Sequence, residues 1–135
     1  MSMGIGAMIH YLGGGSTESA NKFYGRKIKA AKMVDDKFII TFAGGSEIAI
    51  GDNGQSCCES RYMTCDDNPA DLVGGKLRSI EVKKYEEDEK SDEPHEIAFL
   101  EVATETTSIT FCTHVEHNGY YGGFGLNIHQ TKNSR

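Results

Sequence analysis

The chain has 135 residues, which is enough for one compact domain and too few for two, so its motifs must share a single hydrophobic core. Its 16 Gly and 2 Pro residues, with 38% hydrophobic residues, indicate a folded chain with many tight turns. The net charge of −6 is concentrated in residues 86–96, where seven acids accompany one Lys, and the rest of the chain is balanced. Without a basic excess, the chain is a poor candidate for binding a DNA or RNA polymer.

The first 20 residues are expected to form a flexible segment. Residues 13–17 (GGGST) are typical of a linker. The apolar residues before them lack a basic region and are interrupted by Gly4 and Gly6, so we expect neither a secretory signal nor a membrane span. The four cysteines, two of them adjacent, are expected to be reduced thiols of a cytosolic protein. We expect one β-rich ligand-binding domain over residues 21–135.

Residues 27–50 predict a three-stranded antiparallel meander. Apolar and polar residues alternate in KIKAAKMV, KFIITFA and SEIAIG, and the turns fall at Asp35-Asp36 and Gly44-Gly45.

Residues 53–75 break this alternation and predict a helical insert. Ser56 is a candidate helix cap before CCESRYMTC, and Asn68-Pro69 begins a second, shorter helix. Strand patterns resume further along the chain, which places the acidic run in a connection between two strands. These later strands are predicted at residues 76–85, 96–104, 108–115 and 124–130. The predicted fold class is α+β, mainly antiparallel β-sheet with one or two short helices.

The densest group of chemically distinctive residues is 113–124, THVEHNGYYGGF. Its glycines would let backbone amides approach a ligand, its rings offer stacking faces, and its Asn and His side chains can hydrogen-bond to a base edge or a sugar hydroxyl. The structural alternative is a Gly-rich hairpin with a turn at Asn118-Gly119, whose aromatic side chains cover their neighbours across the sheet.

A second group lies at residues 54–62, GQSCCESRY. If a helix begins here, its amides and Arg61 would make a small anion site. The alternative is a buried Cys pair with Arg61 in a structural ion pair to Glu59 or a nearby Asp.

Metal binding and catalysis are the competing hypotheses. Zinc on the cysteines, His114 or His117 is disfavoured because the chain has no C-x-x-C pair and adjacent cysteines are poorly spaced as ligands. A Cys nucleophile with a His base, or phosphodiester hydrolysis by His114, Glu116 and His117, is chemically possible. The spacing of these residues selects neither reaction.

Four motifs resemble the phage-encoded anti-Thoeris sponge family of the first described type. These are, in order, GQSCCESRYMTCDD (54–67), LVGGKL (72–77), HEIAFLEVAT (95–104) and THVEHNGYYGGFGLNI (113–128). The resemblance spans roughly residues 25–128. The first 20 residues have no counterpart in that family. The long acidic loop is a second difference, because its negative charge is unexpected near a site that binds an anion.

The resemblance implies a non-enzymatic, cytoplasmic phage protein that sequesters cyclic ADP-ribose isomers made by bacterial TIR-domain immune enzymes. It also implies a homo-oligomer, a dimer or hexamer, and in some members separate pockets for cyclic oligonucleotides. No cofactor is expected. The alternatives are a nucleotide hydrolase that degrades the same signals and a phage protein-interaction module in which the acidic loop recruits a basic partner.

The expected ligand-binding residues are chosen on chemistry alone. The rings expected to stack on the ligand are those of Tyr120, Tyr121 and Phe124. Its polar edges are expected to contact Asn118 and His114, and its phosphate is expected to bind the guanidinium of Arg61.

Overall fold

The computed structural model describes residues 22–52, 60–88, 95–116 and 126–132. Within them the chain forms eight strands and a single turn of 3-10 helix, η1. Their bounds are β1 (Ile28–Val34), β2 (Lys37–Phe42), β3 (Glu47–Asp52), β4 (Ser60–Thr64), η1 (Pro69–Leu72), β5 (Leu77–Asp88), β6 (His95–Thr104), β7 (Ser108–Glu116) and β8 (Leu126–Lys132).

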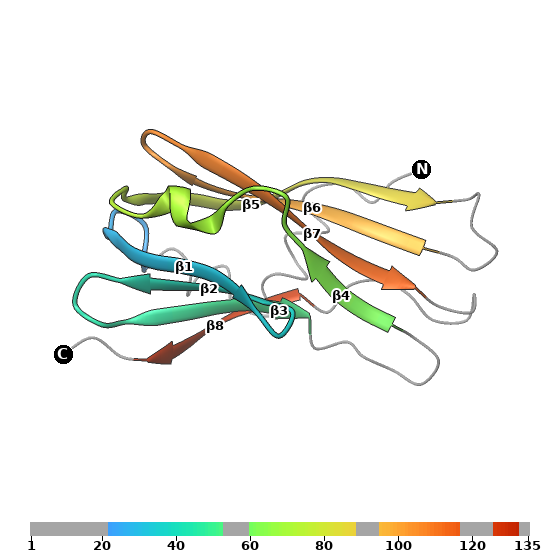
Figure 1. Cartoon of the computed structure of the whole chain (residues 1–135), viewed down its shortest axis with the longest axis horizontal. Coiled ribbons are helices and arrows are strands. Elements are labelled where there is room, and N and C mark those ends of the chain that lie inside the picture. The colour runs from blue at the N-terminus through green and yellow to red at the C-terminus, as the bar shows by residue number, and fades with distance from the viewer. Residues whose placement is uncertain (1–21, 53–59, 89–94, 117–125, 133–135) are drawn as a thin grey trace.

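The strands form two four-stranded antiparallel sheets. One sheet has the order β1-β2-β3-β8 and the other the order β4-β7-β6-β5. Figure 1 shows the strands of the second sheet above those of the first. The prediction of a mainly antiparallel β protein is therefore confirmed.

The core lies between the inner faces of the two sheets. Strict alternation along β6 buries every second side chain, from Glu96 to Thr104, and leaves the others half-buried on the outer face. Phe38 of β2 and Phe111 of β7 are fully buried, and their rings stack at 4.6 Å between centroids, which joins the two sheets. Each such side chain contributes about 1.5–3 kcal/mol through the burial of apolar surface.

The predicted meander over residues 27–50 is confirmed by β1, β2 and β3, which pair in succession. Asp35 and Asp36 form the first turn with φ values of 50° and 60°, a left-handed conformation that Asp tolerates better than most residues. Oδ1 of Asp36 also accepts a hydrogen bond of 3.2 Å from the backbone N–H of Met63. The turn of one sheet is thereby tied to β4, an edge strand of the other.

The first helix of the predicted insert is wrong where the structure describes it, whereas the second, shorter helix is present as a single 3-10 turn. Residues 60–64 form β4, paired with β7, and only Pro69–Leu72 is helical, as a 3-10 turn. The pairing with β7 explains the error, because partners distant in the sequence override local helix signals. The Asn68 side chain accepts a hydrogen bond from the N–H of Ala70, as expected of a cap. Ser56 lies outside the described residues.

Two predicted connections between strands also differ from the structure. The acidic run does not lie wholly in a loop, because β5 extends to Asp88 and β6 begins at His95. The hairpin alternative for residues 113–124 is wrong, because β7 pairs with β4 and β6 whereas β8 pairs with β3 in the other sheet. The connection from β7 to β8 therefore crosses between sheets.

The N-terminal segment, residues 1–20, lies outside the described part of the chain. Among the residues that are described, none belongs to a helix long and apolar enough to cross a membrane.

Candidate functional site

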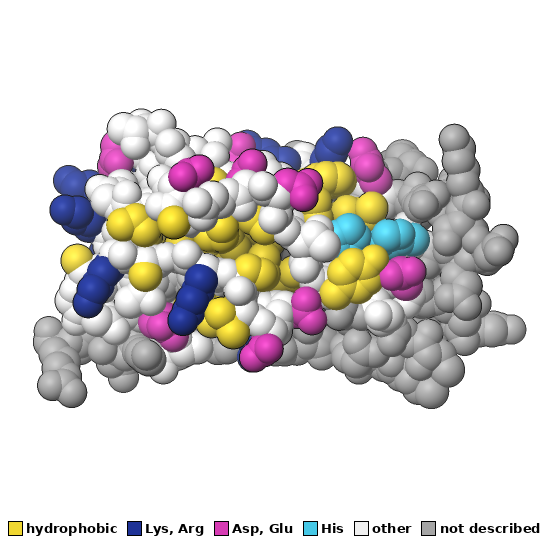
Figure 2. Space-filling view, viewed as in Figure 1, with side chains coloured by type: hydrophobic (Ala, Val, Ile, Leu, Met, Phe, Trp, Pro, Cys, Tyr) yellow, Lys and Arg dark blue, Asp and Glu magenta, His cyan; other side chains and the backbone are white. Residues whose placement is uncertain are grey.

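One end of the outer face of the β4-β7-β6-β5 sheet gathers histidine, tyrosine and glutamate. The strand register brings them together: Tyr62 of β4 lies opposite His114 of β7, and His95 of β6 lies opposite Glu116 of β7. Since alternate residues share a face, His114 and Glu116 lie on the same side of β7. Figure 2 shows histidine side chains beside hydrophobic and acidic ones. We call Tyr62, Thr64, His95, His114 and Glu116 the histidine cluster.

The imidazole of His114 is held at both nitrogens. Its Nδ1 lies 3.0 Å from Nε2 of His95, and its Nε2 lies 2.8 Å from Oγ1 of Thr64. In a neutral imidazole one nitrogen donates and the other accepts, so the three side chains form a continuous hydrogen-bonded chain across β6, β7 and β4. This chain fixes the ring plane of His114.

Tyr62 covers one face of the His114 ring. The two rings stack with centroids 4.5 Å apart and planes within 7° of each other. Burial, a hydrogen bond from the hydroxyl to Glu116 and the charge of Glu116 together raise the pKa of Tyr62 to about 12. The phenol is therefore a neutral hydrogen-bond donor at physiological pH.

His114 is also neutral at pH 7. Burial, and secondarily the neighbouring His95, lower the pKa of His114, and the negative charge of Glu116 only partly opposes them. The cluster thus offers flat rings and the neutral imidazole of His114 beside one carboxylate.

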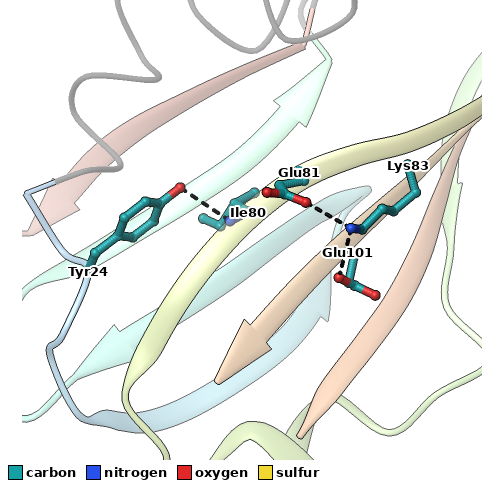
Figure 3. Close-up of polar contacts among 5 residues, drawn as sticks. All are labelled: Tyr24, Ile80, Glu81, Lys83 and Glu101. Atoms are coloured by element: carbon teal, nitrogen blue, oxygen red, sulfur yellow. Dashed lines mark hydrogen bonds and ion pairs between the residues drawn. The ribbon is translucent and has the colours of Figure 1, made fainter. Parts of the chain in front are cut away.

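The opposite end of the same sheet face has a different character. Nζ of Lys83 lies 2.8 Å from Oε2 of Glu81 and 3.4 Å from Oε1 of Glu101, as Figure 3 shows. In the same view the Tyr24 hydroxyl accepts a hydrogen bond from the N–H of Ile80 on the edge strand β5. These are solvated ion pairs and a backbone contact, which offer no concentrated chemistry.

Among the expected ligand-binding residues, the structure places His114 in the cluster. Position 61 of β4 is in register with Val115 of β7, whereas position 62 is in register with His114. Arg61 lies in the strand β4, and residues 54–59, where the helix of the expected anion site would begin, lie outside the described residues. The remaining expected residues, Asn118, Tyr120, Tyr121 and Phe124, lie outside the described residues.

The sequence interpretation missed three members of the cluster: Tyr62, Thr64 and His95. Tyr62 and Thr64 were assigned to a helix, and His95 to an acidic loop. Only the pairing of β4 and β6 with β7 reveals that they converge on His114.

The described cysteines do not support a nucleophile. Cys65 and Cys112 carry free thiols, and burial raises the pKa of both. Sγ of Cys65 donates to the carbonyl oxygens of Asp67 at 3.2 Å and Thr110 at 3.6 Å. A protonated thiol that donates to carbonyls is a poor nucleophile. Across the described ranges, no three His, Cys, Asp or Glu residues form a group able to hold a metal ion.

Comparison with known proteins assigns the chain to a family. A family described as a domain of unknown function (DUF7448) matches residues 21–125, so the chain belongs to that family. No curated protein and no solved structure matches the chain.

Proposed function

For this member of the DUF7448 family, we propose that the protein binds and sequesters a small nucleotide signal of the cyclic ADP-ribose type without degrading it. The histidine cluster forms part of the binding surface. The four motifs that resemble the anti-Thoeris sponge family support the choice of ligand, and the chemistry of the cluster supports binding of a planar heterocycle.

The stacked pair of Tyr62 and His114 is the observation that carries this proposal. A purine needs a flat, apolar face and neutral donors and acceptors at its edge. The ring pair offers the face, and the nitrogens of His95 and His114, which now bond to each other at 3.0 Å, can exchange that bond for one to the ligand. Glu116 ends β7, and residues 117–125, with their glycines and aromatic side chains, follow it directly in the chain.

A protein that acts by sequestration must bind tightly, because it has to hold the signal below the concentration that activates its sensor. Nanomolar affinity corresponds to about 12 kcal/mol. Stacking contributes about 1–3 kcal/mol for each base, so several contacts are needed. An interface between subunits is one way to add them, in keeping with the expected homo-oligomer.

Calorimetric titration with cyclic ADP-ribose isomers tests the proposal. Wild-type protein should bind one isomer with nanomolar affinity, and chromatography of the heated complex should recover that ligand intact. Tyr62→Ala should weaken binding about tenfold or more through lost stacking. Glu101→Gln, on the same face at the ion-pair end, is the matched control and should bind as wild type. If no isomer binds, or if Tyr62→Ala binds with unchanged affinity, the assignment is wrong.

One observation favours a second candidate, hydrolysis of the same signal. Two imidazoles within 3.0 Å of each other are groups that can serve as general base and general acid. Chromatography of the released ligand separates the candidates: a degraded ligand whose yield grows with time, and which His114→Gln abolishes, would identify a hydrolase.

A further inference from the structure

The two histidines of the cluster are spaced as ligands of one metal ion are spaced. Nε2 of His95 and Nδ1 of His114 lie 3.0 Å apart. Two imidazole nitrogens bound to one zinc ion in tetrahedral geometry, each about 2.0–2.1 Å from the metal, lie about 3.3 Å apart. A cation bound to both nitrogens would lie off the line that joins them, so binding needs the two rings to turn as well as a separation larger by a few tenths of an ångström. The proton that now bridges the nitrogens would move to Nδ1 of His95, which leaves both imidazoles neutral.

The remaining nitrogen of His114 has the partner that a metal ligand requires. Nε2 lies 2.8 Å from Oγ1 of Thr64, and when this nitrogen donates its proton to Thr64, the lone pair of Nδ1 points at His95. Histidines that bind metals nearly always donate their other N–H to such an outer partner, which fixes the tautomer and ring orientation. Tyr62 further restrains the ring by stacking on it.

The surrounding charge suits a cation. Glu116 is two residues from His114 on the same face and lies opposite His95 across the strands. Among the described residues, the Tyr62 phenol and the Thr64 hydroxyl also contact His114, and both are neutral. Position 88, an aspartate, is in register with His95 on its other side. No Lys or Arg occupies a position in register with either histidine.

We propose that His95 and His114 form a two-histidine site for a divalent transition-metal cation such as Zn²⁺, Co²⁺ or Ni²⁺, with Thr64 as the outer partner of His114. Imidazole is a favoured ligand of these ions, whereas Mg²⁺ and Ca²⁺ prefer oxygen. Because these two residues supply only two nitrogens, the other coordination positions are open to water or to an anionic ligand. The site uses none of the cysteines, and its existence does not depend on the proposed function.

Metal alone is the probe. Tag-free protein is stripped with a chelator and titrated with Co²⁺, Ni²⁺ and Zn²⁺ by calorimetry, and the visible absorption of the Co²⁺ form is recorded. We expect saturable binding of one ion per chain, tighter for Ni²⁺ than for Co²⁺, and no heat with Mg²⁺. Absence of saturable binding for all three transition metals would overturn the proposal.

Variants locate the ion. His95→Gln and His114→Gln should each lower metal affinity more than tenfold, and Thr64→Val should lower it about 10–100-fold through loss of the outer partner. His129→Gln is the matched control, because His129 lies on β8 in the other sheet. Circular dichroism establishes that each variant is folded.

A rise in the melting temperature of wild-type protein with Zn²⁺ concentration gives a second measure, since ligands that bind the folded state stabilise it. Metal affinity that survives in both His95→Gln and His114→Gln would place the ion elsewhere and refute the site.

Discussion

The two ends of the outer face of the β4-β7-β6-β5 sheet differ in burial and in the kind of polar contact that their side chains make. At one end, Glu81, Lys83 and Glu101 form ion pairs with side chains 27–47% exposed. At the other, Tyr62, His95 and His114 are half-buried and linked by stacking and directed hydrogen bonds. Water weakens the charges at the first end, whereas partial burial strengthens each polar contact at the second. The half-buried end is therefore the one for which we propose ligand binding.

The largest expected effect on stability comes from a substitution in the core that underlies both ends of this sheet face. Phe111→Ala deletes a fully buried ring that stacks on Phe38 between the sheets, and should lower the free energy of unfolding by about 3–5 kcal/mol. Denaturant titration would measure this change. Cys112→Ser, one residue along β7 and half-buried, is the control with a smaller expected loss. Equal losses of unfolding free energy in the two variants would mean that the buried Phe111 ring does not stabilise the fold more than the half-buried Cys112.

A smaller effect is expected at the histidine end. Tyr62→Phe keeps the stack on His114 and removes the hydrogen bond to Glu116, which should cost about 1 kcal/mol. The folded-state pKa of Tyr62 is raised from 10.0 to about 12, so the folded protein holds this proton more tightly than the unfolded chain. The resulting stabilisation is complete below pH 10 and falls away as the pH rises towards about 12.

Denaturation at several pH values, in chelator-treated buffer, checks this sign. Between pH 10 and about 12 wild type should lose stability more steeply than Tyr62→Phe, and the two curves should converge. Ultraviolet difference spectra should show one tyrosine of the wild type ionising late. Parallel stability curves would show that the phenol titrates as an ordinary tyrosine.

The smallest effect is expected at the ion-pair end. Lys83→Met removes both contacts to Glu81 and Glu101, and because these groups are well solvated it should leave the denaturation midpoint unchanged. Measurements at low and high salt should agree for the variant. A clear loss of stability would mean that the two ends differ less than their burial indicates.

Features of the fold that depend on neighbouring residues could be predicted from the sequence, whereas contacts between residues distant in the chain could not. The alternation in residues 27–50 and 96–104 predicted strands correctly, because burial on one face of a strand follows a local period of two residues. The strand at Ser60–Thr64 was missed because it is short and defined by its pairing with β7. His114 was chosen on chemistry, but its partners His95 and Thr64 are 19 and 50 residues away in the chain. Only the register joins them.

The carboxylate of Asp36 has a consequence for how copies of this chain can associate. Edge strands expose backbone amides that invite another strand to add to the sheet, and β4 is such an edge. Its outward amide at Met63 is already bonded to Asp36. A second molecule that extended the sheet here would first have to displace a charged side chain from the adjacent turn. The Asp36 carboxylate therefore opposes the addition of another strand to β4 at Met63.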